Sequence, residues 1–185
     1  MIAVALFCRV PHLNECVPLL FGVTVMQQVL KKSPNTLLIA GIVGGFISAM
    51  VKSGTEDIMP PRLPGVVPPP IQMLNQLGFH ADKMNYFYSG QPINWGGNGV
   101  HIVFSIVVAV IYCFFVQWNK IFGVLAGIPF GLIVALGFHG VILPLLGFGH
   151  DIFLGPAEGF ISEIFGTILW MWTIECFRVY MVERV

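Results

Sequence analysis

The chain has 185 residues, of which 56% are hydrophobic and only 10% are charged. Soluble domains are normally about a quarter charged, so this composition excludes an ordinary soluble domain and predicts a protein that lies in a lipid bilayer. Nine basic residues balance nine acidic ones, which argues against a nucleic-acid-binding surface, because such a surface needs an excess of clustered Lys and Arg.

The first 32 residues carry the weakest signals. Residues 17–30 are apolar but too short to span a bilayer, and Arg9 and Glu15 interrupt the part before them. No basic region opens the chain, so we do not expect a cleaved signal peptide. Residues 1–32 are therefore read as an N-terminal extension. An interfacial helix, a fifth membrane segment and an extension upstream of a second start at Met26 all stay open.

Four long apolar stretches follow, each near the 20-residue length that a spanning helix needs. They cover residues 35–52, 98–117, 121–146 and 159–180. Runs of this length are unlike the short alternating strands of an outer-membrane barrel. We therefore predict an all-α membrane protein with a single four-helix transmembrane domain over residues 33–182.

The basic residues near the ends of these spans predict the orientation. One side carries Lys31, Lys32, Lys120, Arg178 and Arg184. The other side mixes its few basic residues with several carboxylates. Because short cytoplasmic segments retain Lys and Arg, both termini are expected in the cytoplasm.

The outer loop, residues 53–97, is rich in proline. Six prolines lie between residues 60 and 70, namely Pro60, Pro61, Pro64, Pro68, Pro69 and Pro70, and they favour a stiff extended backbone. Residues 71–78 then have the spacing of a short amphipathic helix, and Tyr86, Phe87 and Tyr88 are aromatics that settle at headgroup depth. We predict an interfacial cap over the outer helix ends, with a solvated loop as the alternative.

Small residues recur at four-residue intervals in two spans. The first span has Gly41, Gly45 and Ala49, and the third has Gly123, Gly127 and Gly131. Small residues let helix backbones approach closely in lipid. We therefore expect the first and third spans to contact each other, either within one chain or across a homo-oligomer. Pro129 and Pro144 are expected to kink the third span.

Four ionisable side chains lie inside the predicted spans, namely Lys52, His101, His139 and Glu163. With a rise of about 1.5 Å per residue, all four lie near the outer ends of their helices and share one layer. Ser105 and Thr167 lie one turn below His101 and Glu163. Ionisable groups in a bilayer usually face a bundle interior or a water-filled cavity, so this layer is the candidate functional site.

Simpler roles stay open for part of this layer. Lys52 can extend to the headgroups, and His101 can bond a headgroup or a neighbouring helix. A carboxylate in an apolar helix needs a partner or a proton, so Glu163 is predicted to pair with His139, directly or through water. Glu175 lies one turn from Arg178, which predicts a local ion pair.

Four stretches also carry a family pattern. They are GFISAMVKSGTEDIMPPRLP at 45–64, Asn94 and Trp95 followed by HIVFSIVVAVIYC at 101–113, HGVILPLLG at 139–147, and SEIFGTILWMWTIECFR at 162–178. In order and spacing they resemble the YagU family of bacterial inner-membrane proteins. The resemblance implies a helical protein of the inner membrane that is linked to survival of acid stress, without a known reaction.

The residues and the resemblance together define the candidate site. The candidates for a proton or solute site are Lys52, Glu56, Arg62, His101, His139 and Glu163, supported by Ser105, Ser162, Thr167, Asn94 and Trp95. Histidine titrates near neutrality, so acidification changes the charge of this layer first. The leading hypothesis is a membrane protein that binds or moves protons or a small solute and thereby contributes to acid resistance.

Two other functions stay open. In the first, the polar layer only fixes helix register in a structural or interaction protein. In the second, less favoured one, His101 and His139 ligate a haem or a metal. The spans have no GxSxG or HExxH motif, so we do not expect an enzyme, and neither a cofactor nor a metal is predicted. The expected partners are the lipid bilayer and further copies of the chain.

Overall fold

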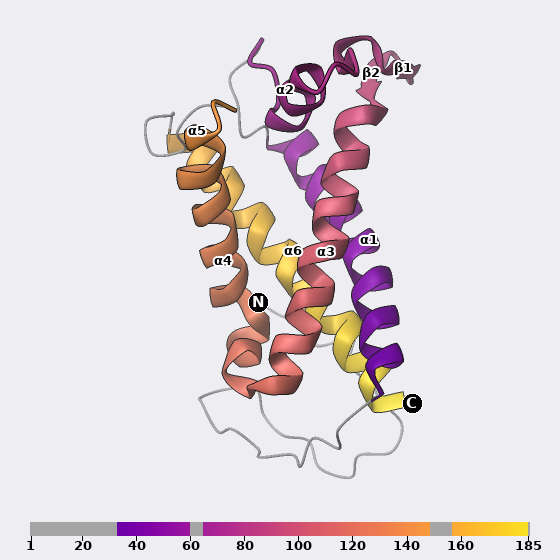
Figure 1. Cartoon of the computed structure of the whole chain (residues 1–185), viewed down its shortest axis with the longest axis vertical. Coiled ribbons are helices and arrows are strands. Elements are labelled where there is room, and N and C mark those ends of the chain that lie inside the picture. Colours follow the sequence, from indigo (N-terminus) through magenta and orange to yellow (C-terminus); the bar gives the residue numbers. More distant parts are fainter. Residues whose placement is uncertain (1–32, 60–64, 149–156, 185) are drawn as a thin grey trace.

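The computed structural model describes residues 33–59, 65–148 and 157–184, so the N-terminal extension lies outside the described residues. Four segments are long and apolar enough to cross a membrane, namely Pro34–Ile58, Trp95–Trp118, Lys120–Leu145 and Ala157–Val182. They pack as one helical bundle (Figure 1). The predicted fold class, an all-α membrane protein with four transmembrane helices, is confirmed.

The first helix, α1 (Pro34–Ile58), runs six residues beyond Lys52, where the predicted span ends. Pro34 lies in its first turn, where no backbone hydrogen bond is lost. The helix ends shortly before Pro60 and Pro61, because proline disfavours a helical conformation in the residue before it. Lys52 therefore lies within the helix and not at its end.

The third span is not the continuous helix predicted for residues 121–146. It begins with the 3₁₀ segment η2 (Lys120–Gly127), in which Leu125 and Ala126 have left-handed φ values of 51° and 56°. The helix α4 (Ile128–Gly137) follows, then the π-helical turn η3 (Phe138–Ile142) and the short α5 (Leu143–Leu145). Pro129 therefore starts a helix instead of kinking one.

Gly127 ends η2 with a φ of 70°, a backbone conformation that residues with a side chain rarely adopt. A Cβ at this position would also lie 2.6 Å from Cζ of the Tyr112 ring, so the ring fills the space left by the missing side chain. The irregular start of the third span is thus packed against the helix α3 (Trp95–Trp118).

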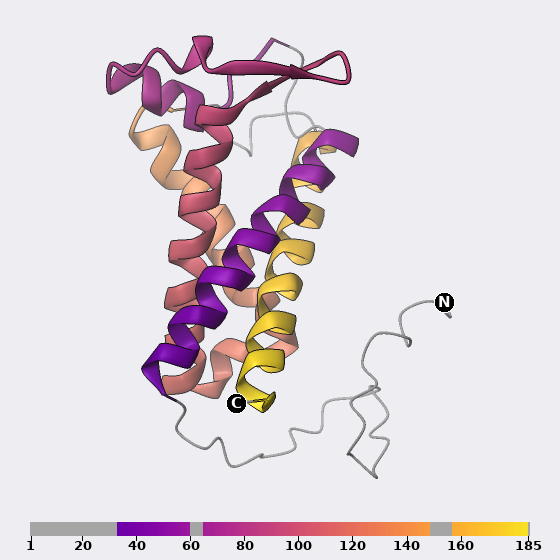
Figure 2. The same cartoon turned by 90° about the vertical axis from the view of Figure 1, so that its right-hand side faces the viewer.

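The α1 helix packs against both α3 and α6 (Ala157–Arg184), as Figure 2 shows from the side. A Cβ added at Gly41 or Gly45 would lie 2.6 Å from the Cα of Val110 or Ile106, both in α3. Gly44, on the neighbouring row, faces α6 instead. The predicted pairing of the first and third spans within one chain is therefore wrong, because small residues permit close approach without selecting the partner.

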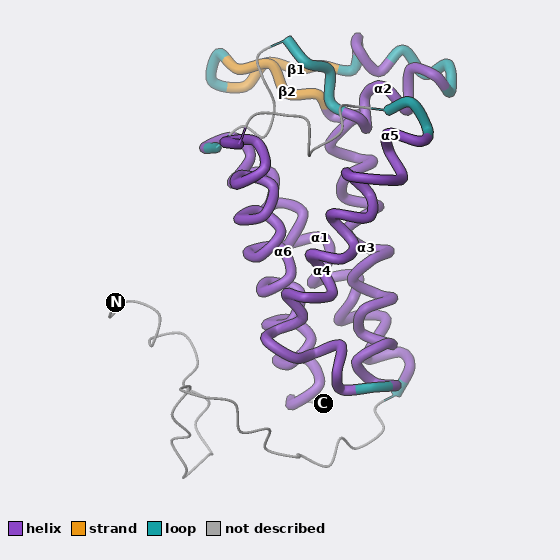
Figure 3. Tube along the Cα trace, turned by 90° about the vertical axis from the view of Figure 1, so that its left-hand side faces the viewer, coloured by secondary structure: helices purple, strands orange, loops and turns teal. Residues whose placement is uncertain are grey.

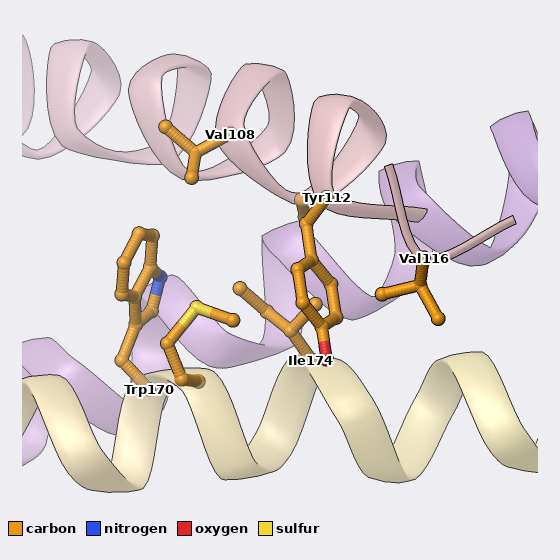
Figure 4. Packing of buried hydrophobic residues seen from close by; sticks show 7 residues of the cluster. Val108, Tyr112, Val116, Trp170 and Ile174 are labelled. Carbon is orange, nitrogen blue, oxygen red and sulfur yellow. The ribbon is translucent and has the colours of Figure 1, made fainter. Parts of the chain in front are cut away.

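The other small residues have different neighbours. Ala49 is fully buried in α1, and Gly123 faces Val116 of α3. Gly131 faces Met171 of α6. The helix α4 of the third span therefore packs on α6, and it also contacts η2 and η3 of its own span. Figure 3 shows the helices from the side opposite to that of Figure 2. A buried core between α3 and α6 consists of Val108, Ala109, Tyr112, Val116, Trp170, Met171 and Ile174, and Figure 4 shows how these side chains pack.

A cap covers one end of the bundle. It comprises α2 (Pro69–Gln76), the 3₁₀ turn η1 (Ala81–Lys83) and the antiparallel strands β1 (Asn85–Tyr88) and β2 (Gln91–Asn94). Figure 3 shows the two strands lying across this capped end. The helix fits the prediction of a short amphipathic segment, but the hairpin was not predicted. Ser89 and Gly90 join its strands with φ values of 53° and 79°, a turn that favours tight hairpins.

Candidate functional site

The closest ionic contact at the capped end joins the first and last spans. Lys52 Nζ, from α1, donates to Glu163 Oε1, from α6, at 2.7 Å. Lys52 is only 6% exposed and Glu163 only 2% exposed. Gly166, one turn below Glu163, faces the same part of α1: an added Cβ would lie 3.1 Å from Oγ1 of Thr55 and, at an ordinary contact distance, 3.7 Å from Nζ of Lys52. Lys52 is thus held inside the bundle and does not extend to the headgroups.

Glu163 also has other neighbours. His139 Nε2 lies 3.6 Å from the same Oε1, an ion-pair distance when the imidazole is protonated. Thr167, one turn along α6, donates to Oε1 at 3.3 Å. On the other side, Glu56 Oε1 lies 3.4 Å from Lys52 Nζ. The structure therefore brings four of the predicted site residues, Lys52, Glu56, His139 and Glu163, into one cluster, with Thr167 beside them.

His139 owes its position to the π-helical turn η3. Proline lacks an N–H, so Pro144 cannot donate to the carbonyl four residues before it, and the backbone before it is free to widen. Such π-helical turns are rare and often occur at functional sites. The turn places His139 on the face of the third span that meets Glu163. Pro144 is the sequence signal for this irregularity, although it does not specify its form.

His101 lies beside this cluster. Its Nδ1 is 3.4 Å from Oγ of Ser53 in α1. Ser105, predicted to support His101, bonds elsewhere: it donates to the carbonyl of Gly45 at 2.8 Å and accepts from Trp170 Nε1 at 2.6 Å. Ser48 Oγ lies 3.1 Å from Ser105 Oγ. Hydroxyl and indole groups thus tie α1, α3 and α6 together below the ionisable cluster.

Sequence reasoning missed Ser48, Ser53 and Trp170. Their spacing held a signal, since Trp170 follows Glu163 by two helical turns and Ser48 precedes Lys52 by one turn. Trp170 and Ser48 therefore lie on the same helix face as an ionisable residue, whereas Ser53 directly follows Lys52 and has no such spacing. Serine and tryptophan are common in membrane helices, so this signal becomes specific only when the partners across the bundle are known.

A cavity of about 660 Å³ adjoins the cluster. Its walls come from α1, α3, α4, η3 and α6, and residues of α2 cover it at the capped end. The ribbons of α3 and α4 diverge toward this end in Figure 1, and side chains of both line the cavity. Lys52, Glu56, His101, His139, Glu163 and Thr167 all border it.

Three aromatic side chains also line the cavity. Phe104 meets Phe138 edge to face with ring centroids 4.6 Å apart, and it stacks on Trp170 at 6.4 Å. Phe104 follows His101 by one turn and Trp170 follows Glu163 by two, so these rings lie on the inner side of the ionisable cluster. The cavity therefore has an ionisable side near the cap and an aromatic side toward the bundle core.

Of the remaining predicted residues, Asn94 and Ser162 make structural contacts, and Asn94 also borders the cavity. Asn94 caps α3 by accepting from the Gly97 N–H at 2.6 Å, and its amide donates to the Ala81 carbonyl at 2.6 Å. Trp95 opens α3 and is exposed, and Ser162 donates to the Met59 carbonyl. Arg62 lies outside the described residues.

The predicted ion pair of Glu175 and Arg178 forms at the opposite end, with both nitrogen–oxygen distances at 2.6 Å. Tyr112 donates to Glu175 at 2.9 Å, which ties α3 to α6 there. Across the parts of the chain that the structure describes, no group of three or more His, Cys, Asp or Glu side chains is arranged to hold a metal ion.

Comparisons with known proteins complete the description of the site. A family described as "Protein of unknown function (DUF1440)" matches residues 46–176, a range that includes the whole ionisable cluster. The chain is 31% identical over 171 residues to Inner membrane protein YagU of Escherichia coli (strain K12), covering 78% of this chain and 83% of that relative. No solved structure matches the chain significantly.

Proposed function

The chain belongs to the DUF1440 family and is related to an inner membrane protein, and we propose that it is a multi-pass inner-membrane protein whose cavity binds and moves protons or a small solute. The resemblance to the YagU family seen in the sequence is confirmed by both matches. The activity is our proposal, and it rests on the ionisable cluster at the capped end.

The single observation that carries the proposal is the buried contact of Lys52 with Glu163 on the wall of a cavity. A buried ion pair contributes little net stability compared with apolar side chains of similar size. Ionisable groups in membrane helices characteristically line ion or substrate pathways. Stability alone therefore gives no reason for this pair, whereas a binding role does.

The distances around Glu163 and Lys52 support a mechanism in which a proton on His139 changes the ion pairs of the cluster. Protonation of His139 puts a second positive charge 3.6 Å from Oε1 of Glu163, where it competes with Lys52. Lys52 then has Glu56, at 3.4 Å, as its alternative partner. Histidine changes charge in the range between neutral and mildly acidic pH, so the pairing changes in that range.

The cavity lies at the capped end of the described bundle. Toward the opposite end, the bundle is filled by Val108, Tyr112, Trp170 and Met171. The site therefore binds its ligand, and transfer across the membrane requires the helices to rearrange. Because Lys120 and Arg178 lie at the opposite end, we place the capped end in the periplasm, where external acid arrives first. A contribution to acid resistance follows from this placement.

Proton flux into liposomes tests the proposal. The full chain is reconstituted around a trapped pH-sensitive dye, acid is added outside, and valinomycin with potassium removes the membrane potential. We expect a faster pH change than in protein-free liposomes and a reduced rate for Glu163→Gln. Glu158→Gln is the matched control, since Glu158 is an exposed residue of α6 that does not border the cavity. Parent protein that gives no flux above protein-free liposomes overturns the proposal.

A structural role is the second candidate, and the bonds of Ser105 favour it. They join three helices, and no described buried side-chain nitrogen or oxygen lacks a hydrogen-bond partner. In that case the polar residues only fix how the helices fit together. Proton flux by the parent protein separates the two candidates: a structural role alone predicts that Glu163→Gln lowers the melting temperature in detergent while the parent gives no proton flux.

A further inference from the structure

We propose that the solute taken up by the cavity is an organic cation with apolar substituents, which exchanges with protons. This inference rests on the proposed function and specifies the class of ligand. It follows from three properties of the described lining residues: their charge, their aromatic faces and the volume they enclose.

The charge of the cavity favours a cation. Its ionisable lining residues are Lys52, Glu56, Asp57, His101, His139 and Glu163. With both histidines neutral, one lysine faces three carboxylates, so the lining carries a formal charge of −2. In a site of low dielectric constant, such an excess attracts a cation and repels an anion. This count already includes the Lys52 ammonium, so the charge of −2 remains after Lys52 has paired with Glu163.

The aromatic side of the cavity favours an organic cation over a metal ion. The faces of aromatic rings carry partial negative charge and attract ammonium and similar groups within about 6 Å. Phe104, Phe138 and Trp170 provide such rings, and Val103, Val134 and Leu143 provide aliphatic surface. A hydrated metal ion gains nothing from these groups, whereas apolar substituents on a cation do. The volume of about 660 Å³ lies within the usual range for small organic ligands.

Protons compete with such a cation. The charged and titratable lining groups are Lys52, Glu56 and Asp57 from α1, His101 from α3, His139 from η3 and Glu163 from α6, while α2 and α4 contribute only uncharged residues. Protonation of both histidines raises the formal charge of the lining from −2 to zero. The affinity for the cation therefore falls as the pH falls and the histidines become protonated.

Two ions of the same shape and opposite charge test the inference. The purified full chain in detergent is dialysed against radiolabelled tetraphenylphosphonium or tetraphenylborate, with protein-free micelles as the blank. At about pH 7.5 we expect tetraphenylphosphonium to bind about tenfold more tightly than tetraphenylborate, and to bind more weakly at about pH 5.5. Equal affinities for both ions, or no saturable binding of tetraphenylphosphonium, overturn the inference.

Paired variants locate the binding. Phe104→Leu removes a ring from the cavity and should weaken tetraphenylphosphonium binding by about three- to tenfold. Phe114→Leu is its control, because Phe114 is in the same helix but does not border the cavity. Glu56→Gln should weaken binding as well, whereas Glu158→Gln should not. If the cavity variant and its control bind tetraphenylphosphonium with the same affinity in both pairs, the ion binds elsewhere and the inference fails. Proton flux in liposomes still tests the proposed function independently.

Discussion

Lys52 and Glu163 lie 111 positions apart in the sequence, yet their side chains meet at 2.7 Å inside the bundle. This contact joins the first spanning helix to the last. It also sets the local arrangement, because His139, Thr167 and Glu56 are all placed around it. The contribution of this contact to the free energy of unfolding can be measured separately from any activity.

Removing one partner of this pair should destabilise the fold, because it leaves a buried charge without its counter-charge. We expect Lys52→Met and Glu163→Leu each to lower the free energy of unfolding by about 3–5 kcal/mol. The double variant should lose less than the sum of the two single variants. Thermal unfolding in detergent measures this, with exposed Lys83→Met as the control. Additive losses would show that the two side chains do not interact.

Adding a methyl group to Gly45 should separate α1 from α3. A Cβ there would lie 2.6 Å from Cα of Ile106, a backbone atom that cannot move alone. We expect Gly45→Ala to cost about 1–3 kcal/mol of stability. Gly54, in the same helix, has no atom within 4 Å of its added Cβ, so Gly54→Ala should be neutral or slightly stabilising. Equal melting temperatures for the two variants would contradict the packing of α1 on α3.

Asn94 should link the cap to the bundle through two kinds of bond. Its side-chain oxygen caps α3, and its amide donates to Ala81 and Asn85 in the cap. Asn94→Ala loses both functions and should cost about 1 kcal/mol or more, whereas Asn94→Asp keeps the capping oxygen. We expect trypsin to cleave after Lys83 faster in both variants, with a lower melting temperature only for alanine. Parent-like cleavage of the aspartate variant would show that the amide does not hold the cap.

The pH dependence of proton flux should depend on His139. Its imidazole lies 3.6 Å from Glu163, so its protonation alters the pairing of that carboxylate between about pH 7.5 and 5.5. In His139→Gln we expect the flux to lose its rise with acidification over this range. The exposed His80, in the cap, serves as the control in His80→Asn, since asparagine tolerates its left-handed backbone, with a φ of 47°. A loss of pH dependence in both variants would exclude His139 as the specific group.

The cap should face the periplasm. In a chain without its native cysteines, Lys83→Cys places a thiol in the cap, and Lys120→Cys places one at the start of η2. We expect a membrane-impermeant maleimide to label the first position in intact spheroplasts and the second only after lysis. The reverse pattern would invert the orientation and with it the side from which the cavity is filled.

The apolar stretches predicted the spanning helices well, because an uncharged apolar run of about 20 residues matches the thickness of a bilayer and must form a helix there to satisfy its backbone hydrogen bonds. Helical rise also placed Lys52, His101, His139 and Glu163 at one height. It did not predict which of them meet, because height along a helix does not give its rotation or its neighbours. The sequence analysis therefore favoured His139 as the partner of Glu163, whereas Lys52 lies closer.

Other features depended on contacts that a pattern cannot specify. The hairpin has a Ser-Gly turn between two four-residue strands, but β1 is exposed along its whole length and neither strand has the alternation that marks a strand. The left-handed Leu125 and Ala126 have no local sequence signal for their backbone conformation. The glycine row in α1 was predicted to contact the third span, but it contacts α3. Glycine allows any helix to approach closely and does not specify which helix does so.

The position of α1 between α3 and α6 also constrains how the protein is assembled. Synthesis and membrane insertion proceed from the N-terminus, so α1 enters the bilayer while α6 is still unmade. Until α6 arrives, the α1 face that carries Gly44 lacks its packing partner, and the ammonium group of Lys52 has Glu56 of its own helix, but not Glu163, as a counter-charge. The bundle is therefore completed only by its last helix. A chain truncated before Glu163 would leave the buried Lys52 ammonium without the carboxylate that it contacts at 2.7 Å in the finished bundle.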